Sequence, residues 1–196
     1  DGAKIAVLVK NGIQGTDEYG IIQADKTEIL LFNASDGSLA RRWEVGSAMM
    51  LRFEPSGRQI ATAGGDIVFL ETATGVEKWR LRPDEIAGLP GPVKLAAPLP
   101  FPRLGGCGGV ESINFVTFSK KQPLMIAAGM GGTCGFLLAW DWKAHQLKRQ
   151  AVLTFPGSGF GLVYGYEIMA LGFDEQAGVA ITITKNGTID KWDVTG

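Results

Sequence analysis

Two short segments carry residue types that could do chemistry. Residues 129–135 form a glycine-rich stretch after an apolar run, in the style of a turn that binds dinucleotide phosphates. The third glycine of that pattern falls on Cys134, and residues 136–142 predict a strand where a phosphate-binding helix would be needed. Ser158 lies between two glycines, which resembles the nucleophile turn of a serine hydrolase. However, that turn has the pattern Gly-x-Ser-x-Gly, and His145, the one histidine of the sequence, would have to serve as the base. We therefore predict neither nucleotide binding nor serine hydrolysis.

The cysteine and histidine residues do not form a metal-binding pattern. Cys107 and Cys134 are too few for a disulfide framework and are wrongly spaced for a zinc knuckle. One bridge between them is conceivable, but two reduced thiols are the favoured state. His145 falls in a predicted hairpin turn, where a solvated side chain is expected. With no pair of His, Cys or carboxylate residues at ligand spacing, we predict no metal, no cofactor and no enzymatic activity.

The charge balance narrows the choice of partners. The 196 residues include 19 Lys and Arg against 20 Asp and Glu, a formal net charge of −1. Such a balance argues against a nucleic-acid surface and against an electrostatic membrane anchor. No apolar run approaches the length of a membrane span, so we expect no membrane insertion. The thiols expected to be reduced and the lack of a visible leader favour the cytoplasm.

An internal repeat organises the chain and predicts an all-β fold. Three copies, over 49–75, 113–141 and 168–196, each have an apolar run ending in Phe, a polar turn, a small-residue strand and a strand ending in an aromatic or acidic residue. Glycine interrupts every run and the apolar positions lack a helical period. The repeated positions that we expect to be structural are Phe53, Phe118, Phe173, Trp140, Asp141, Trp192 and Asp193.

The ends of these copies resemble the WD repeat. Asp190-Lys191-Trp192-Asp193-Val194-Thr195-Gly196 resembles the ending of such a repeat, and Trp140-Asp141 is a second instance. The segment 53–57 resembles the family's turn between the first two strands of a blade. The family's Gly-His pair is missing, so its buried hydrogen-bonded tetrad is not expected in the usual form. A quinoprotein-type propeller is the alternative, because the segment 74–79 resembles its Gly-x-x-x-Trp blade ending.

The resemblance implies an arc of a β-propeller with about four blades. We expect an incomplete first blade over 1–46, complete blades over 47–82 and 112–153, and an incomplete fourth blade over 154–196. The innermost strand of the first blade would precede residue 1, and the outermost strand of the last would follow residue 196. We therefore expect part of a larger propeller, whose missing blades come from the same chain or another. Tryptophans recur at equivalent blade positions, which favours packing over ligand stacking.

Two insertions interrupt the blade rhythm and are candidate partner-binding segments. Residues 83–111 hold six of the nine prolines, which favours extended or polyproline-II structure over a helix. This insertion is either an arm that binds a partner or a connector packed on the same molecule. A smaller insertion, 155–166, is rich in glycine and aromatic residues. The candidate partner-binding residues are Pro90, Pro92, Pro98, Pro100, Phe101, Pro102, Phe160, Tyr164 and Tyr166.

The function that these features favour is a non-catalytic protein-interaction scaffold. The repeat supplies a rigid platform, and its partners would be proteins, including a multi-subunit complex. The alternative is part of a propeller enzyme, quinoprotein-like or hydrolase-associated, with its active site in the central channel. A third hypothesis is a purely architectural role within an assembly.

Overall fold

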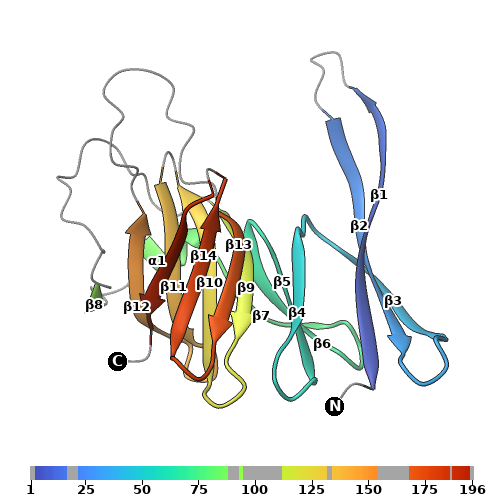
Figure 1. The fold of residues 1–196 in the computed structure, drawn as a ribbon. Helices are drawn as coiled ribbons and strands as arrows, with labels where there is room; N and C mark the ends of the chain where they lie inside the picture. The colour runs from blue at the N-terminus through green and yellow to red at the C-terminus, as the bar shows by residue number, and fades with distance from the viewer. Residues whose placement is uncertain are drawn as a thin grey trace.

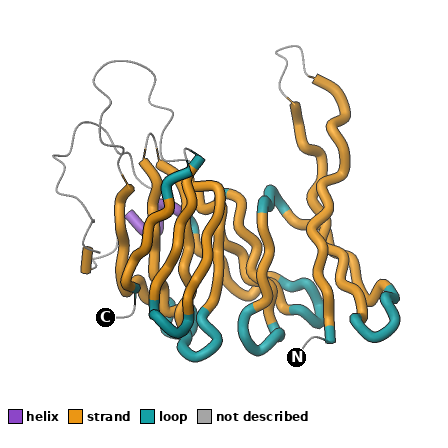
Figure 2. The backbone as a smooth tube through the Cα atoms, viewed as in Figure 1, coloured by secondary structure: helices purple, strands orange, loops and turns teal. Residues whose placement is uncertain are grey.

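The computed structural model describes residues 3–16, 22–87, 93–94, 112–131, 134–153, 168–185 and 187–194. Most of them lie in β-strands that form four sheets, arranged side by side in a row (Figure 1). The prediction of an all-β chain is therefore confirmed. Strands run the length of each sheet and the turns gather at the sheet ends (Figure 2).

Consecutive antiparallel strands build each sheet. The first sheet has the order β1 (Lys4–Thr16), β2 (Ile22–Asn33), β3 (Leu39–Val45). The second has the order β4 (Met50–Phe53), β5 (Gln59–Gly64), β6 (Asp66–Glu71), β7 (Glu77–Leu81). The third has β9 (Ser112–Phe118), β10 (Leu124–Gly131), β11 (Cys134–Asp141) and β12 (Gln146–Leu153), and the two-residue β8 (Val93–Lys94) pairs with β12 in parallel. The fourth has β13 (Ile168–Asp174), β14 (Val179–Thr184), β15 (Ile189–Asp193).

Equivalent residues of the sequence repeat pair in the same register in all four sheets. In each sheet one cross-strand pair occupies the same place near the end of a hairpin. These pairs are Ile5 with Phe32, Ile60 with Leu70, Met125 with Trp140, and Ala180 with Trp192. Because paired residues of antiparallel strands point to the same side, this register fixes which face of each sheet every side chain joins.

Equivalent turns are closed by a side chain that accepts backbone hydrogen bonds. Glu54 accepts from the amides of Ser56 and Arg58 at 2.7 Å each. At the same place in the third sheet, the Ser119 hydroxyl accepts from the amides of residues 121 and 122. In the fourth sheet, Asp174 accepts from residues 176 and 177. Short polar side chains favour such turns because they satisfy the backbone donors locally.

The sheets pack face to face, with a separate apolar core in each of the three spaces between them. The first space is filled around Ile29, Leu31, Ile60 and Leu70, which are all buried. The second core includes Ala61, Ala63, Ile67, Phe69, Ile113, Met125, Leu138 and Trp140. The third includes Ile126, Ala128, Leu137, Ala139, Ile168, Ala180 and Trp192. Alanines on the central strands let neighbouring sheets approach closely.

Polar contacts also join neighbouring sheets. Gly65 and Ile113 exchange two backbone hydrogen bonds, of 3.2 and 2.8 Å, between the second and third sheets. Glu175 accepts from the Ser119 hydroxyl at 2.5 Å and from the Lys120 amide at 2.8 Å, which links the fourth sheet to the third. These bonds join the second sheet to the third and the third sheet to the fourth.

The start of the proline-rich insertion departs from the prediction of extended structure. Residues Pro83–Ala87 form the short helix α1. Proline is well suited to the first helical position, where its missing N–H is not needed, and Asp84 and Glu85 are acidic residues in the first turn. Ile86 is 4% exposed and anchors α1 on the core between the second and third sheets. No helix in the described ranges is long and apolar enough to cross a membrane.

Candidate functional site

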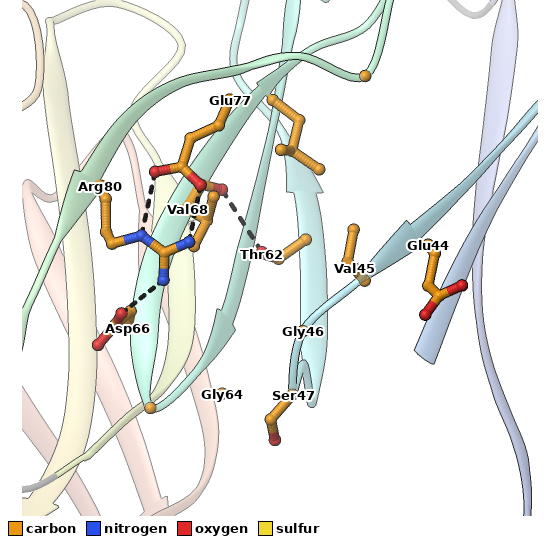
Figure 3. Close-up of a pocket in the computed structure, with 13 residues that line it drawn as sticks. Glu44, Val45, Gly46, Ser47, Thr62, Gly64, Asp66, Val68, Glu77 and Arg80 are labelled. Atoms are coloured by element: carbon orange, nitrogen blue, oxygen red, sulfur yellow. Dashed lines mark hydrogen bonds and ion pairs between the residues drawn. The ribbon is translucent and has the colours of Figure 1, made fainter. Parts of the chain in front are cut away.

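A cleft of about 480 Å³ opens between the first and second sheets (Figure 3). One wall comes from the end of β3 and the connector to β4, and the other from β5, β6 and β7. Residues from both walls line it: Glu44, Val45, Gly46, Ser47, Thr62, Gly64, Gly65, Asp66, Val68, Leu70, Gly75, Glu77 and Arg80. The cleft is the candidate binding site of the described part of the chain.

Two glycines that line the cleft allow the walls to approach each other. A Cβ atom on Gly64 would lie 2.7 Å from the Cα of Ala48, so the connector can cross β5 only over a glycine. The Met49 amide completes this crossing with a 2.7 Å hydrogen bond to the carbonyl of Ala63. Gly75 has a φ of +77°, and a Cβ there would lie 2.0 Å from the indole of Trp43. Trp43 of the first sheet therefore packs directly on a turn of the second.

Arg80 is held rigidly at one wall by two carboxylates. Its Nε and Nη2 donate to the two carboxylate oxygens of Glu77 at 3.0 and 2.7 Å, and its Nη1 donates to Asp66 at 2.7 Å. Figure 3 shows the three side chains converging. The hydrogen bonds with Glu77 and Asp66 raise the pKa of Arg80, and the hydrogen bond from Arg80 lowers the pKa of Glu77. Arg80 and Glu77 are therefore charged at neutral pH, and the hydrogen bonds of Arg80 fix the geometry of the three side chains before any ligand arrives.

The charge and floor of the cleft define what it could bind. The charged side chains that meet in it are the carboxylates of Asp66 and Glu77 and the guanidinium of Arg80, which leaves a net charge of −1. Glu44 contributes to the lining, but its side chain lies on the other face of β3 from Trp43 and Val45. Val68 and Leu70 contribute apolar surface beside them. A cation on an aliphatic stem, such as a lysine or arginine side chain, suits this combination. Within the described residues, no group of three His, Cys, Asp or Glu side chains is placed to hold a metal ion.

These cleft residues were missed by reasoning from the sequence. A signal was available in strand alternation, which places Asp66, Val68 and Leu70 on one face of β6. Arg80 pairs with Val68 across β6 and β7, and so joins that face. Asp66 and Arg80 therefore place two charged side chains beside the apolar Val68 and Leu70, and such a mixed face indicates a partly open space. Which sheet faces it, and at what distance, depends on residues far away in the sequence.

The residues predicted to be structural lie mostly between the sheets. Phe53, Phe118 and Phe173 each pack against one of the three cores. Trp140 and Trp192 are both 4% exposed. The remaining two, Asp141 and Asp193, are at the ends of β11 and β15; Asp141 accepts from the amides of Lys143 and Ala144, while Asp193 is exposed. The repeated positions thus sit at the same places in successive sheets.

The candidate partner-binding residues are outside the described part of the chain, so their role stays a prediction. They are Pro90, Pro92, Pro98, Pro100, Phe101, Pro102, Phe160, Tyr164 and Tyr166. The segment resembling a dinucleotide turn is described on both sides of residues 132–133. It connects β10 to β11, so a strand follows it at the place where a dinucleotide-binding turn would need a helix.

A buried hydrogen bond from a tryptophan to a threonine is present in the fourth sheet alone among the described residues. Trp192 Nε1 donates to the hydroxyl of Thr182 at 3.1 Å in a buried setting. In the third sheet the equivalent Trp140 Nε1 is buried without a hydrogen-bond partner in the described residues. The register explains this, because Ala127 occupies the place of Thr182. Thr182 was not among the residues predicted to be structural from the sequence.

The aromatic side chains of the second space pack on one another. Trp79 stacks on Trp140 with ring centroids 6.0 Å apart, and Phe69 stacks on Trp142 at 6.3 Å. His145 is exposed in its turn, as predicted, with a φ of 53° and its ring edge-on to Trp79 at 4.4 Å. These tryptophans are thus packing residues between the sheets, as predicted.

Comparison with known proteins supports the fold and leaves the family open. No family model matches the chain, and no curated protein matches its sequence. Among solved structures, the chain is similar to dihydro-heme d1 dehydrogenase NirN in complex with DHE, with a TM-score of 0.54 and 10% identity. The match covers 95% of this chain and 31% of the NirN chain. At this identity the likeness shows the fold alone. The chain is a β-propeller-type arc of four antiparallel sheets, a partial propeller as predicted.

Proposed function

We propose that this chain is a WD-repeat-like propeller segment that acts as a protein-interaction scaffold, and that its cleft receives a lysine or arginine side chain of a protein partner. The observation that carries this proposal is the rigid group of Arg80, Asp66 and Glu77, with a net charge of −1, beside an apolar floor in the cleft. The partner's aliphatic stem would lie along Val68 and Leu70.

Electrostatics favour this occupant over an anionic or neutral one. At 4 Å, opposite unit charges attract by about 1 kcal/mol in bulk water and by about 4 kcal/mol at a partly shielded protein surface. Asp66 and Glu77 are already fixed by Arg80, so binding would cost little ordering of these groups. In Figure 3 the side chain of Glu44 points away from the Arg80 group, so the carboxylates that a cation in the cleft would meet are those of Asp66 and Glu77.

A peptide titration tests this proposal. A lysine-rich peptide capped at both ends would be added to the protein while the backbone amide resonances of Gly64 and Gly65 are followed by NMR. We expect saturable shifts at these amides, absent with the glutamate-substituted peptide. E77Q should weaken binding several-fold, because it removes one cleft carboxylate while the ion pair between Asp66 and Arg80 remains. D84N is the matched control, since the exposed Asp84 of α1 is outside the cleft.

Two results would contradict the proposal. The first is equal binding of the lysine-rich and glutamate-substituted peptides. The second is an equal loss of affinity in E77Q and D84N, which would place the attraction in the overall charge of the chain.

A second candidate function is part of a propeller enzyme with its active site in the channel of the ring. It is supported by the structural likeness to NirN, a dihydro-heme d1 dehydrogenase. Titration with heme, followed by absorbance, separates the two functions. Stoichiometric binding with a shifted absorption band would favour the enzyme, and an unchanged spectrum would favour the scaffold.

A further inference from the structure

The two end sheets of the row carry apolar side chains on their outward faces. On the first sheet Ile5 is 52% exposed, Val7 41% and Leu39 51%. On the fourth sheet Ile183 is 39% exposed and Ile189 62%. We define the front face as the outward side of the first sheet, comprising Ile5, Val7, Leu30, Phe32 and Leu39. We define the rear face as the outward side of the fourth sheet, comprising Val179, Ile181, Ile183 and Ile189.

The front face repeats a surface that is buried in every other sheet. Ile5 pairs with Phe32 at the place held by Ile60 with Leu70, Met125 with Trp140, and Ala180 with Trp192. Ile60, Met125 and Ala180 are each 0% exposed, because the preceding sheet covers them. Ile5 occupies the same register position and is half exposed. Among the described residues, no sheet precedes the first.

The rear face repeats the complementary surface. Ile183 pairs with Ile189 at the place held by Leu8 with Ile29, Ala63 with Ile67, and Ala128 with Leu137. In the first three sheets this position packs on the following sheet, and Ile29, Ala63, Ile67, Ala128 and Leu137 are each 0% exposed. A Cβ atom on Gly172, which pairs with Ile181, would meet no described atom within 4 Å. Space for another sheet therefore remains over the rear face.

We propose that the front and rear faces are two halves of one sheet-to-sheet interface, and that a second copy of this chain fills them head to tail. Each internal interface is a rear-type surface packed on a front-type surface. The described residues leave one of each uncovered, and a second copy supplies both. Such a heterologous contact forms a ring if its rotation closes. Two copies would contribute eight sheets, within the range of about four to eight blades found in propellers.

Complementary blocking of the two faces tests the proposal. The variant I5D/V7D blocks the front face, and I183D/I189D blocks the rear face. M49D/V76D is the matched control, since Met49 and Val76 are 58% and 55% exposed but lie on neither face. Sedimentation analysis gives the mass of each protein alone and of an equal mixture of the two blocked variants. We expect self-association of the wild type and the control, and a monomer for each blocked variant alone.

The decisive sample is the mixture, because each blocked variant retains the face that the other lacks. It should form a heterodimer, a result that misfolded variants could not give. A monomeric wild type would overturn the proposal. So would a mixture that stays monomeric, or a blocked variant that still dimerises alone, since the latter would mean pairing of like faces. Because no substituted residue lines the cleft, the outcome is independent of the peptide titration.

Discussion

Replacement of Gly75 by alanine should reveal how firmly the first sheet is packed on the second. Gly37, Gly57 and Gly75 all have positive φ values, of +70°, +72° and +77°, and each lies in a turn between two strands. An alanine at such a φ costs about 1 kcal/mol from the backbone alone. At Gly37 and Gly57 a Cβ would meet nothing within 4 Å, whereas at Gly75 it would lie 2.0 Å from the Trp43 indole. Displacement of a packed ring adds about 1–3 kcal/mol.

We therefore expect a loss of unfolding free energy of about 1 kcal/mol for G37A and G57A, and about 2–4 kcal/mol for G75A. Urea unfolding followed by tryptophan fluorescence measures these values. In a W43A background the cost of G75A should fall to about 1 kcal/mol, because only the backbone penalty remains. Equal costs at all three glycines, or a G75A cost unaffected by W43A, would refute the packing of Trp43 on this turn.

Three further substitutions test the internal contacts. T182V should cost about 1–3 kcal/mol of unfolding free energy by leaving Trp192 Nε1 unpaired, and T182S should retain most of the stability. Burial raises the pKa of Glu54, but the hydrogen bonds that its carboxylate accepts lower the pKa by more. The pKa therefore falls below its ordinary value of 4.5. Because its folded pKa is depressed, stability should be present above about pH 4.5 and lost as pH falls through the folded value, and E54Q should flatten this dependence in a pH series of urea midpoints. Burial raises the pKa of Asp190, whose Oδ2 lacks a partner in the described residues. Its charged form is therefore disfavoured in the fold, so D190N should raise the thermal midpoint at pH 7. This gain should disappear below the unfolded pKa of 3.8, where the aspartate is protonated in both states. An equal gain at both pH values would contradict this explanation.

Features carried by local pattern could be predicted from the sequence. Alternating apolar residues between glycine turns set the strands, and the spacing of Phe53, Phe118 and Phe173 gave the repeat. The packing of tryptophans between sheets followed from their recurrence at equivalent places. In these cases the residues that determine the structure are close together in the chain.

Features that depend on distant contacts could not be predicted in this way. The proline count of the insertion favoured extended structure, but burial of Ile86 against the sheets supports a helical turn. The two-residue β8 is added to the third sheet by parallel pairing with β12, which no local pattern indicates. The cleft exists because Trp43 and the 46–49 connector meet two glycines of another sheet. That geometry joins segments with no common sequence signal.

The salt dependence of peptide binding tests the scaffold proposal most directly. The screening length falls from about 20 Å to about 7 Å between roughly 20 mM and 200 mM salt, so attraction to the net charge of the cleft should weaken. We predict that the Kd of the lysine-rich peptide rises several-fold over this range in the wild type and in D84N, and rises less in E77Q. A Kd that is independent of salt, or a rise of the same size in all three proteins, would contradict a charged binding site in the cleft.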